Sequence, residues 1–297
     1  MTNKKLFKTI MIICLGLVVV SCLFLEGCIP TEKYERTVQL TESLEPGKEF
    51  ATLTHNGTIT VTGADITQCD ITATIIGKAN TVEDAQKIAE QVEIKFHRSG
   101  DKLTAKIEKP TLIDNKYVTV NLVVAVPGHT SLDLITHNGE VRIDNITGRT
   151  KAQTHNGAVS ARSITGETIL ATHNGRVSCQ QVTGNMQLLT HNGEISCKEV
   201  SGDVQLTTHN GGIQVAYSNN ASGAINAKME THNGGIELKS PSGLSAKLDA
   251  STHNGSIHTD VPVTIVGKLN KKNIKGTIGD GQGSLYLKTH NGSINIK

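Results

Sequence analysis

The chain has 297 residues with 29 basic and 27 acidic side chains, and its aromatic content is only 3% with no tryptophan, which excludes a bulky aromatic core. Residues 1–27 hold three of the lysines and one of the glutamates, so the rest of the chain has 26 side chains of each sign and no net charge. A neutral protein has no electrostatic basis for binding nucleic acid, and we exclude that partner.

The first 27 residues have the layout of a secretory signal. Three lysines within the first eight residues precede an uncharged apolar run over residues 10–25. The run ends in Leu-Glu-Gly-Cys28, which resembles the bacterial lipobox, where a cysteine is lipidated and becomes the new N-terminus. Cys22 follows Val-Val-Ser and is the alternative lipidation site. An uncleaved membrane anchor is a further alternative, because the run is just shorter than a spanning helix.

This N-terminus predicts a protein of the bacterial cell envelope, outside the cytoplasm and either periplasmic or surface-facing. Its first expected partner is a membrane, which it contacts through the lipid on Cys28. Residues 28–34 would form a short tether to the folded part.

Residues 35–130 are expected to form an N-terminal β portion that contains one helix and the first coil of a repeat. The helix is predicted at about residues 82–92, where Thr81 has the residue type of an N-cap and Asp84 lies in the first turn. Runs of strand-forming residues flank it. Because the open ends of a β-stack would polymerise, we expect this portion to act as a cap.

The tetrapeptide Thr-His-Asn-Gly occurs nine times and dominates the remaining sequence. Its histidines are His55, His137, His155, His173, His191, His209, His232, His253 and His290. The copies from 137 to 209 are 18 residues apart, and the later spacings are 23, 21 and 37. A short fixed period indicates a stack of equivalent coils, each of which contacts its neighbours.

Each coil is predicted to contain two strands and two corners. Apolar and polar residues alternate after each tetrapeptide, as in Val177-Ser178-Cys179, which is typical of a half-buried strand. A second corner, such as Val182-Thr183-Gly184, follows, and the chain returns through a second strand with Met186 and Leu188 facing inward. Residues 131–297 are therefore expected to form an all-β, parallel β-solenoid, with an expanded coil at 261–287.

The Asn-Gly pair suits a corner, because both residues tolerate a positive φ. Parity along the second strand predicts that the asparagine points inward. Stacked carboxamides about 4.8 Å apart can hydrogen-bond to one another as a ladder. The predicted ladder consists of Asn56, Asn138, Asn156, Asn174, Asn192, Asn210, Asn233, Asn254 and Asn291. The alternative folds are an antiparallel sandwich or a propeller, but neither would require an identical tetrapeptide at every second turn.

After the signal and the lipobox Cys28, only Cys69, Cys179 and Cys197 remain, so the chain is not a disulfide-scaffolded module. Cys179 and Cys197 occupy equivalent inward positions one coil apart, within the range of a disulfide. They can equally be reduced thiols that pack as small hydrophobes. The two interpretations stay open at this point, and intact mass before and after reduction separates them.

A column of outward histidines is the one feature that suggests a metal, since neighbouring imidazoles could share zinc, copper or nickel. The residues concerned are His137, His155, His173, His191 and His209. Repetition alone duplicates every corner residue, so we favour a structural column and expect no metal and no cofactor.

Catalysis is not expected. Enzymes that act on polysaccharides use clustered carboxylates with assigned acid and base roles. The acidic residues of the repeats, Glu140, Glu167, Glu194 and Asp203, are instead scattered over outward positions. The chain also has only four Tyr and four Phe to offer as sugar-stacking platforms.

The lipoprotein signal, the Thr-His-Asn-Gly corners at 18-residue spacing and the Ile-Thr-Gly second corners resemble the adhesin-like β-solenoid domains of bacteria, a family of unknown function. The resemblance covers most of residues 50–297 and implies a right-handed coil and an envelope location. It carries over no catalytic residue. We therefore expect a structural or adhesin-like surface whose partner is an envelope protein, another cell or a matrix. The alternatives are an envelope-stress sensor or accessory lipoprotein, and metal binding through the histidine column.

Overall fold

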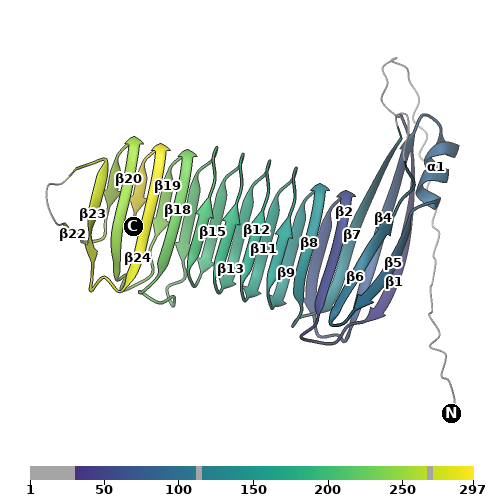
Figure 1. Cartoon of the computed structure of the whole chain (residues 1–297), viewed down its shortest axis with the longest axis horizontal. Coiled ribbons are helices and arrows are strands. Elements are labelled where there is room, and N and C mark those ends of the chain that lie inside the picture. Colours follow the sequence, from purple (N-terminus) through teal and green to yellow (C-terminus); the bar gives the residue numbers. More distant parts are fainter. Residues whose placement is uncertain (1–30, 112–115, 266–269) are drawn as a thin grey trace, which may run out of the picture.

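The computed structural model describes residues 31–111, 116–265 and 270–297. Apart from one helix, these residues form strands and turns in two long sheets, which we call sheet A and sheet B (Figure 1). In the repeats each coil adds one strand to each sheet, and the strands of neighbouring coils run parallel. The predicted all-β solenoid is confirmed, and the parallel pairing rules out the antiparallel sandwich.

Sheet A has twelve strands. Their spatial order is β1 (Glu32–Ser43), β4 (Gln68–Ala79), β7 (Tyr117–Pro127), β3 (Ile59–Ala64), β9 (Val141–Thr147), β11 (Val159–Thr165), β13 (Val177–Thr183), β15 (Ile195–Val200), β17 (Ile213–Tyr217), β19 (Ile236–Lys239), β25 (Ile294–Ile296) and β21 (Ile257–Thr259). The repeats thus form one continuous sheet with the N-terminal strands.

Sheet B has thirteen strands. Their spatial order is β22 (Thr264–Ile265), β23 (Asn273–Ile278), β20 (Ala246–Asn254), β24 (Gly283–Asn291), β18 (Asn226–Asn233), β16 (Val204–Thr207), β14 (Met186–Leu189), β12 (Thr168–Ala171), β10 (Thr150–Gln153), β8 (Ser131–Asn138), β2 (Glu49–Asn56), β6 (Lys102–Glu108) and β5 (Glu93–Ser99). The Thr-His-Asn-Gly corners lie where these strands end.

The core lies between the two sheets and is aliphatic. In one coil Val177 and Cys179 of β13 are buried, as are Met186 and Leu188 of β14, as the alternation predicts. Register partners in adjacent coils are chemically alike, for example Leu170 and Leu188. Burying an aliphatic side chain of this size contributes about 1.5–3 kcal/mol, so each coil is stabilised mainly by contact with the coils beside it.

Four strands of sheet A that follow a tetrapeptide, β9, β11, β13 and β15, each contain an extra residue in the left-handed region. This residue is Asn145, Ser163, Gln181 or Glu199, with φ between 53° and 57°. It places two residues between consecutive inward side chains, so that Cys197 and Val200 are both buried. Sequence alternation did not predict it, because the four side chains share no chemistry and only asparagine favours this conformation.

We expect Glu199→Gly to stabilise the protein by about 0.5–1 kcal/mol, because glycine adopts a positive φ without steric cost. Glu199 is exposed and its φ is 54°. Lys198→Gly is the matched control: Lys198 is an exposed strand residue, and glycine there should lower stability by a similar amount. The urea midpoints of the two variants should move in opposite directions. Equal shifts would mean that the positive φ of Glu199 carries no steric cost.

The N-terminal end is capped by helix α1 (Val82–Glu90), which begins at the predicted N-cap: Asp84 N–H donates to Thr81 Oγ1 at 3.2 Å. The helix packs on β4 and β1, and Arg36 of β1 donates to the carbonyl of Ala89.

The expected tether of residues 28–34 is corrected in part, because β1 starts at Glu32 and pairs with β4 from that residue.

The C-terminal coils are not stacked in chain order. After β21 the chain leaves the stack, and β22 and β23 cover its end, where β23 pairs antiparallel with β20. Residues 283–297 then return as β24 and β25, which lie between β18–β19 and β20–β21 (Figure 1). The predicted expansion at 261–287 therefore ends earlier, because residues 283–287 already belong to β24.

Candidate binding surface

The threonine of each tetrapeptide is the inward residue of the corner. Thr190 is 2% exposed, and its hydroxyl donates to the carbonyl of Gly175 in the preceding coil at 2.9 Å. The same bond recurs along the stack, with donors Thr136, Thr154, Thr172, Thr208, Thr231, Thr252 and Thr289. Because each of these hydroxyls donates to a backbone carbonyl of the neighbouring coil, these buried polar atoms of the corner are paired.

The asparagines form one ladder along the whole stack. Asn192 Nδ2 donates to Asn174 Oδ1 at 2.8 Å, and Asn174 donates in turn to Asn156. The other donors are Asn138, Asn156, Asn210, Asn233, Asn291 and Asn254, at 2.7–2.8 Å. The expectation that these side chains point inward is wrong: Asn192 is exposed and Thr190 is buried. On the outside, each carboxamide can exchange its remaining hydrogen bonds with water and leaves none unsatisfied.

The corner glycine is required by close approach of two backbones. A Cβ on Gly175 would lie 1.9 Å from the carbonyl oxygen of Gly157 in the preceding coil, and Gly175 does not have a left-handed φ. The predicted reason for Asn-Gly, tolerance of positive φ, therefore does not apply at Gly175, although it holds at the equivalent Gly57 and Gly157, whose φ values are 139° and 153°. Only glycine lets consecutive coils come close enough for the threonine and asparagine bonds to form.

The nine histidines of the tetrapeptides form a single exposed column beside the asparagine ladder. Neighbouring ring centroids are 4.6–4.9 Å apart and the rings are within 18° of parallel. Following the spatial order of the coils, His290 lies between His232 and His253. Parallel rings direct their nitrogen lone pairs side by side and not toward a common point. Among the residues that the structure describes, no group of three His, Cys, Asp or Glu is arranged to hold a metal ion.

We expect acidification to destabilise the stack. Partial burial, together with His232 and His253, lowers the pKa of His290, and partial burial, Lys109 and His137 lower that of His55. An unfolded histidine titrates near 6.5. Since the folded pKa is depressed, the unfolded chain binds more protons as pH falls through about 6.5, and the folded state loses stability. The melting temperature should be a few degrees lower at pH 5 than at pH 7.5.

The control for this pH effect is a histidine outside the column. His290→Gln should reduce the difference between the two melting temperatures, whereas His97→Gln on β5 should leave it unchanged. Coincident melts of the wild type at both pH values would contradict electrostatic coupling along the column.

Cys179 and Cys197 are register partners in β13 and β15, and both are buried free thiols. The hydrogen bond between the two sulfurs and their burial raise the pKa of the Cys179 thiol. Cys69 is a buried free thiol in β4. All three side chains therefore pack as small hydrophobes in the structure.

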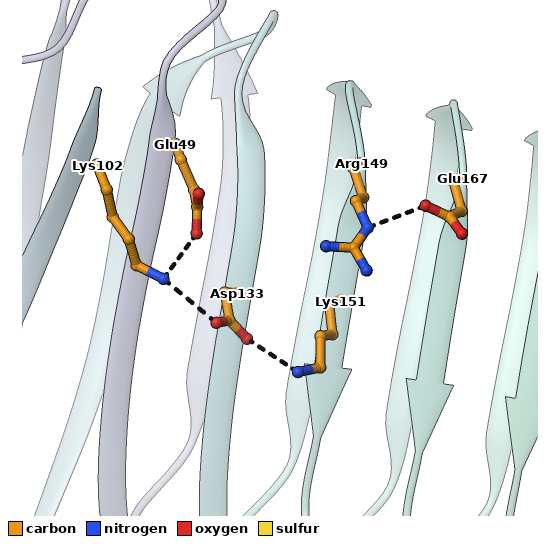
Figure 2. A network of polar contacts seen from close by, with 6 residues as sticks. All are labelled: Glu49, Lys102, Asp133, Arg149, Lys151 and Glu167. Atoms are coloured by element: carbon orange, nitrogen blue, oxygen red, sulfur yellow. Dashed lines mark hydrogen bonds and ion pairs between the residues drawn. The ribbon is translucent and has the colours of Figure 1, made fainter. Parts of the chain in front are cut away.

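The outer face of sheet B carries ion pairs that connect one coil to the next, as Figure 2 shows. Lys102 lies 2.7 Å from Glu49 and 3.4 Å from Asp133, and Asp133 is 3.8 Å from Lys151. These side chains are about one third exposed. Each pair alone contributes little at a solvated surface, but the series links four neighbouring strands of the sheet.

The acidic residues that the sequence analysis placed on outward positions all have a partner. Glu167 accepts from Arg149 at 2.9 Å, and Glu194 lies 3.0 Å from Arg176. Glu140, just before β9, pairs with Arg142 of that strand, and Asp203 accepts two hydrogen bonds from Asn226. The carboxylates thus connect coils and corners, and they do not converge on one point.

An open depression of about 480 Å³ lies on the outer face of sheet B, over β12, β14, β16, β18 and β24. Its lining includes Gln187, Gln205 and Tyr286. Sequence reasoning did not find it, because Tyr286 reaches this place only through the insertion of β24 beside β18. The spacing of the tetrapeptides does not predict that β24 lies beside β18.

The lipidation prediction, Cys28 with Cys22 as the alternative, lies outside the described residues, as does the signal over 1–27. Within the described ranges no helix has the length and hydrophobicity needed to cross a membrane.

These features define a class of protein: an elongated β-solenoid with two-strand coils, one repeated corner motif and a separate cap at each end. The family model described as Toastrack DUF4097 matches residues 49–297, and the chain belongs to this family. No curated protein matches the chain.

The solved structures that are similar to the chain include the following three. A candidate adhesin from Bacteroides fragilis has a TM-score of 0.49 and 14% identity, and the match covers 91% of this chain and 100% of that one. A candidate cell adhesion protein from Clostridium sporogenes has a TM-score of 0.30 and 13% identity over 88% and 99% of the two chains. A candidate lipid-binding protein from Parabacteroides distasonis has a TM-score of 0.28 and 10% identity over 88% and 96%.

Proposed function

We propose that this chain is a non-catalytic envelope protein, held to a membrane by a lipid on Cys28, that presents the outer face of its solenoid to a partner at the cell surface or in a matrix. The observation that carries the proposal is the outer face of sheet B, a regular surface that extends over the whole stack and includes the depression lined by Gln187, Gln205 and Tyr286. The charged N-terminal segment and the apolar run before Cys28 support export.

The distribution of charge supports a role in binding. Acidic side chains on the outer faces are paired along the stack, as Glu167 is with Arg149 and Asp249 with Lys275. Catalysis would require a general acid and a general base in separate environments that set their pKa values apart. Carboxylates that are each paired with a neighbouring basic residue argue against such a pair. The charged side chains that connect one coil to the next stabilise the stack. The neutral residues between them remain available to contact a partner.

The position of the cap fits a membrane anchor. β1 begins at Glu32, four residues after Cys28, and belongs to the capped end of the solenoid. A lipid on Cys28 would keep that end near the bilayer. Sheet A then extends from the cap by ten strands beyond β4, nine of them from the repeats, over roughly 45–50 Å at the usual strand separation.

The anchor is tested by metabolic labelling with palmitate in a bacterial host. The wild type and Cys22→Ala should incorporate the label and sediment with membranes. Cys28→Ala should remain unlabelled and leave the membrane fraction. Label on Cys28→Ala that disappears in Cys22→Ala would move the anchor to the alternative site, and absence of label in all three would overturn lipid anchoring.

The binding role is tested separately with the fluorescently labelled full chain on intact bacterial and host cells. The folded chain should bind at least one of these surfaces saturably, and the heat-unfolded chain should not. Absence of saturable binding to every cell type would overturn the proposal of a binding surface.

A further inference from the structure

We propose that the depression on the outer face of sheet B is a binding site for a neutral oligosaccharide. This inference rests on the proposed binding role and assigns the ligand class. The depression extends from Gln187 across Gln205 and Lys228 to Tyr286, which are register neighbours in four successive strands. Three strand separations span roughly 14 Å, the length of a short oligosaccharide and not of a single small metabolite.

The free polar groups of the depression are neutral amides. Asn185, Gln187 and Gln205 are exposed, and no other residue that the structure describes hydrogen-bonds to their side chains. A carboxamide presents two N–H donors and an oxygen acceptor in one plane. Sugar hydroxyls both donate and accept, so a row of such amides is complementary to adjacent hydroxyl groups.

The charged groups at the depression are already paired, which argues against an ionic ligand. Lys228 lies 2.9 Å from Glu230, and Glu167 accepts from Arg149 at the same distance. An anion would have to displace Glu230 from the lysine. A cation would meet only Glu167 and Asp203, both occupied by other donors.

One side of the depression is a polar chain that is fixed before any ligand arrives. Ser284 Oγ donates to Asn226 Oδ1 at 2.8 Å, and Asn226 donates to Asp203 through Nδ2 at 3.0 Å and through its backbone N–H at 2.9 Å. Three coils contribute to this chain, and Asp203 keeps free lone pairs for a hydroxyl donor. Prepositioned acceptors reduce the entropy lost on binding.

Tyr286 supplies the aromatic surface. It is partly exposed, and the Lys228 ammonium lies 5.8 Å from the centroid of its ring. In a chain with four tyrosines and no tryptophan, this one lies at the end of the amide row. An aromatic ring offers an apolar face to the C–H side of a pyranose, while the phenol hydroxyl remains available for a hydrogen bond.

The test uses the full chain in a detergent without a sugar headgroup, on an array of neutral and anionic oligosaccharides. The chain should bind neutral oligosaccharides of three or more units, and the signal should persist in 0.5 M NaCl, where surface charges are screened to roughly 4–5 Å. Tyr286→Ala and Gln205→Ala should each weaken binding at least tenfold. Gln214→Ala, an exposed residue of sheet A, is the matched control and should leave it unchanged.

Gln205 is fully outward, so its variant keeps the fold testable even where Tyr286→Ala lowers stability. No binding to any neutral oligosaccharide, binding only to anionic ones with loss in salt, or binding unaffected by both variants would each overturn the sugar site. Cell binding that survives periodate oxidation of the cells and the Gln205→Ala substitution would overturn this inference while the proposed function stands. Absence of all cell binding would overturn the proposed function itself.

Discussion

Deletion of residues 283–297 is expected to unfold the solenoid, although these are the last fifteen residues of the chain. β24 pairs with both β18 and β20, and β25 pairs with both β19 and β21. Removal of β24 and β25 exposes one edge of each of these four neighbouring strands. It also takes four buried aliphatic side chains from the core, those of Leu285, Leu287, Ile294 and Ile296. At about 1.5–3 kcal/mol each, their loss is comparable with the 5–15 kcal/mol that stabilises a typical domain.

The matched control removes more residues from the middle of the chain. Deletion of residues 157–174 joins Asn156 to Gly175 and regenerates a complete corner. β13 then pairs with β9 in the register that β11 uses now, because Val141, Val159 and Val177 are equivalent. Circular dichroism melts should show a cooperative, slightly less stable protein for this variant and no transition for the truncated chain. A truncated chain that melts like the wild type would contradict the inserted arrangement.

The coil could be predicted from sequence because its stabilising contacts repeat with the sequence. Like residues stack on like, so the 18-residue period from His137 to His209 gave the coil length and the alternation gave the inward face. The order of coils in space could not be predicted in this way. The spacing of 37 residues between His253 and His290 indicates an insertion, but every coil offers the same corner to its neighbours, and the order depends on how the inserted segment packs.

The candidate surface was harder to predict than the fold. Parity along the strand placed Asn192 inside, and the structure places it outside, because the corner exposes two consecutive residues after Thr190. Repetition identified the asparagines and histidines as columns but could not say which groups remain free for a ligand. That depends on Tyr286 and Lys228, which are 58 residues apart and adjacent only through the inserted coil.

A second large effect is expected from a single methyl group at the corner. A Cβ on Gly211 would lie 1.9 Å from the carbonyl oxygen of Gly193 and 2.5 Å from its carbonyl carbon. Both partners are backbone atoms, so no side-chain rotation relieves the overlap. Moving these two coils apart would weaken the bond from Thr208 Oγ1 to the same Gly193 oxygen, now 2.8 Å, and the bond from Gly193 N–H to the carbonyl of Asn210, now 3.0 Å. Gly211→Ala should therefore destabilise the protein by about 3 kcal/mol or more.

The adjacent residue provides the control. A Cβ on Gly212 would meet nothing closer than the carbonyl oxygen of Gly235 at 3.5 Å, an ordinary contact, and other coils carry Glu140, Ala158, Arg176 or Glu194 at this position. Gly212→Ala should change stability by no more than about 0.5 kcal/mol. Urea titration of the two variants compares the same chemical change one residue apart. Similar midpoints would mean that the close approach of consecutive corners, on which the threonine bonds and the asparagine ladder depend, does not determine stability.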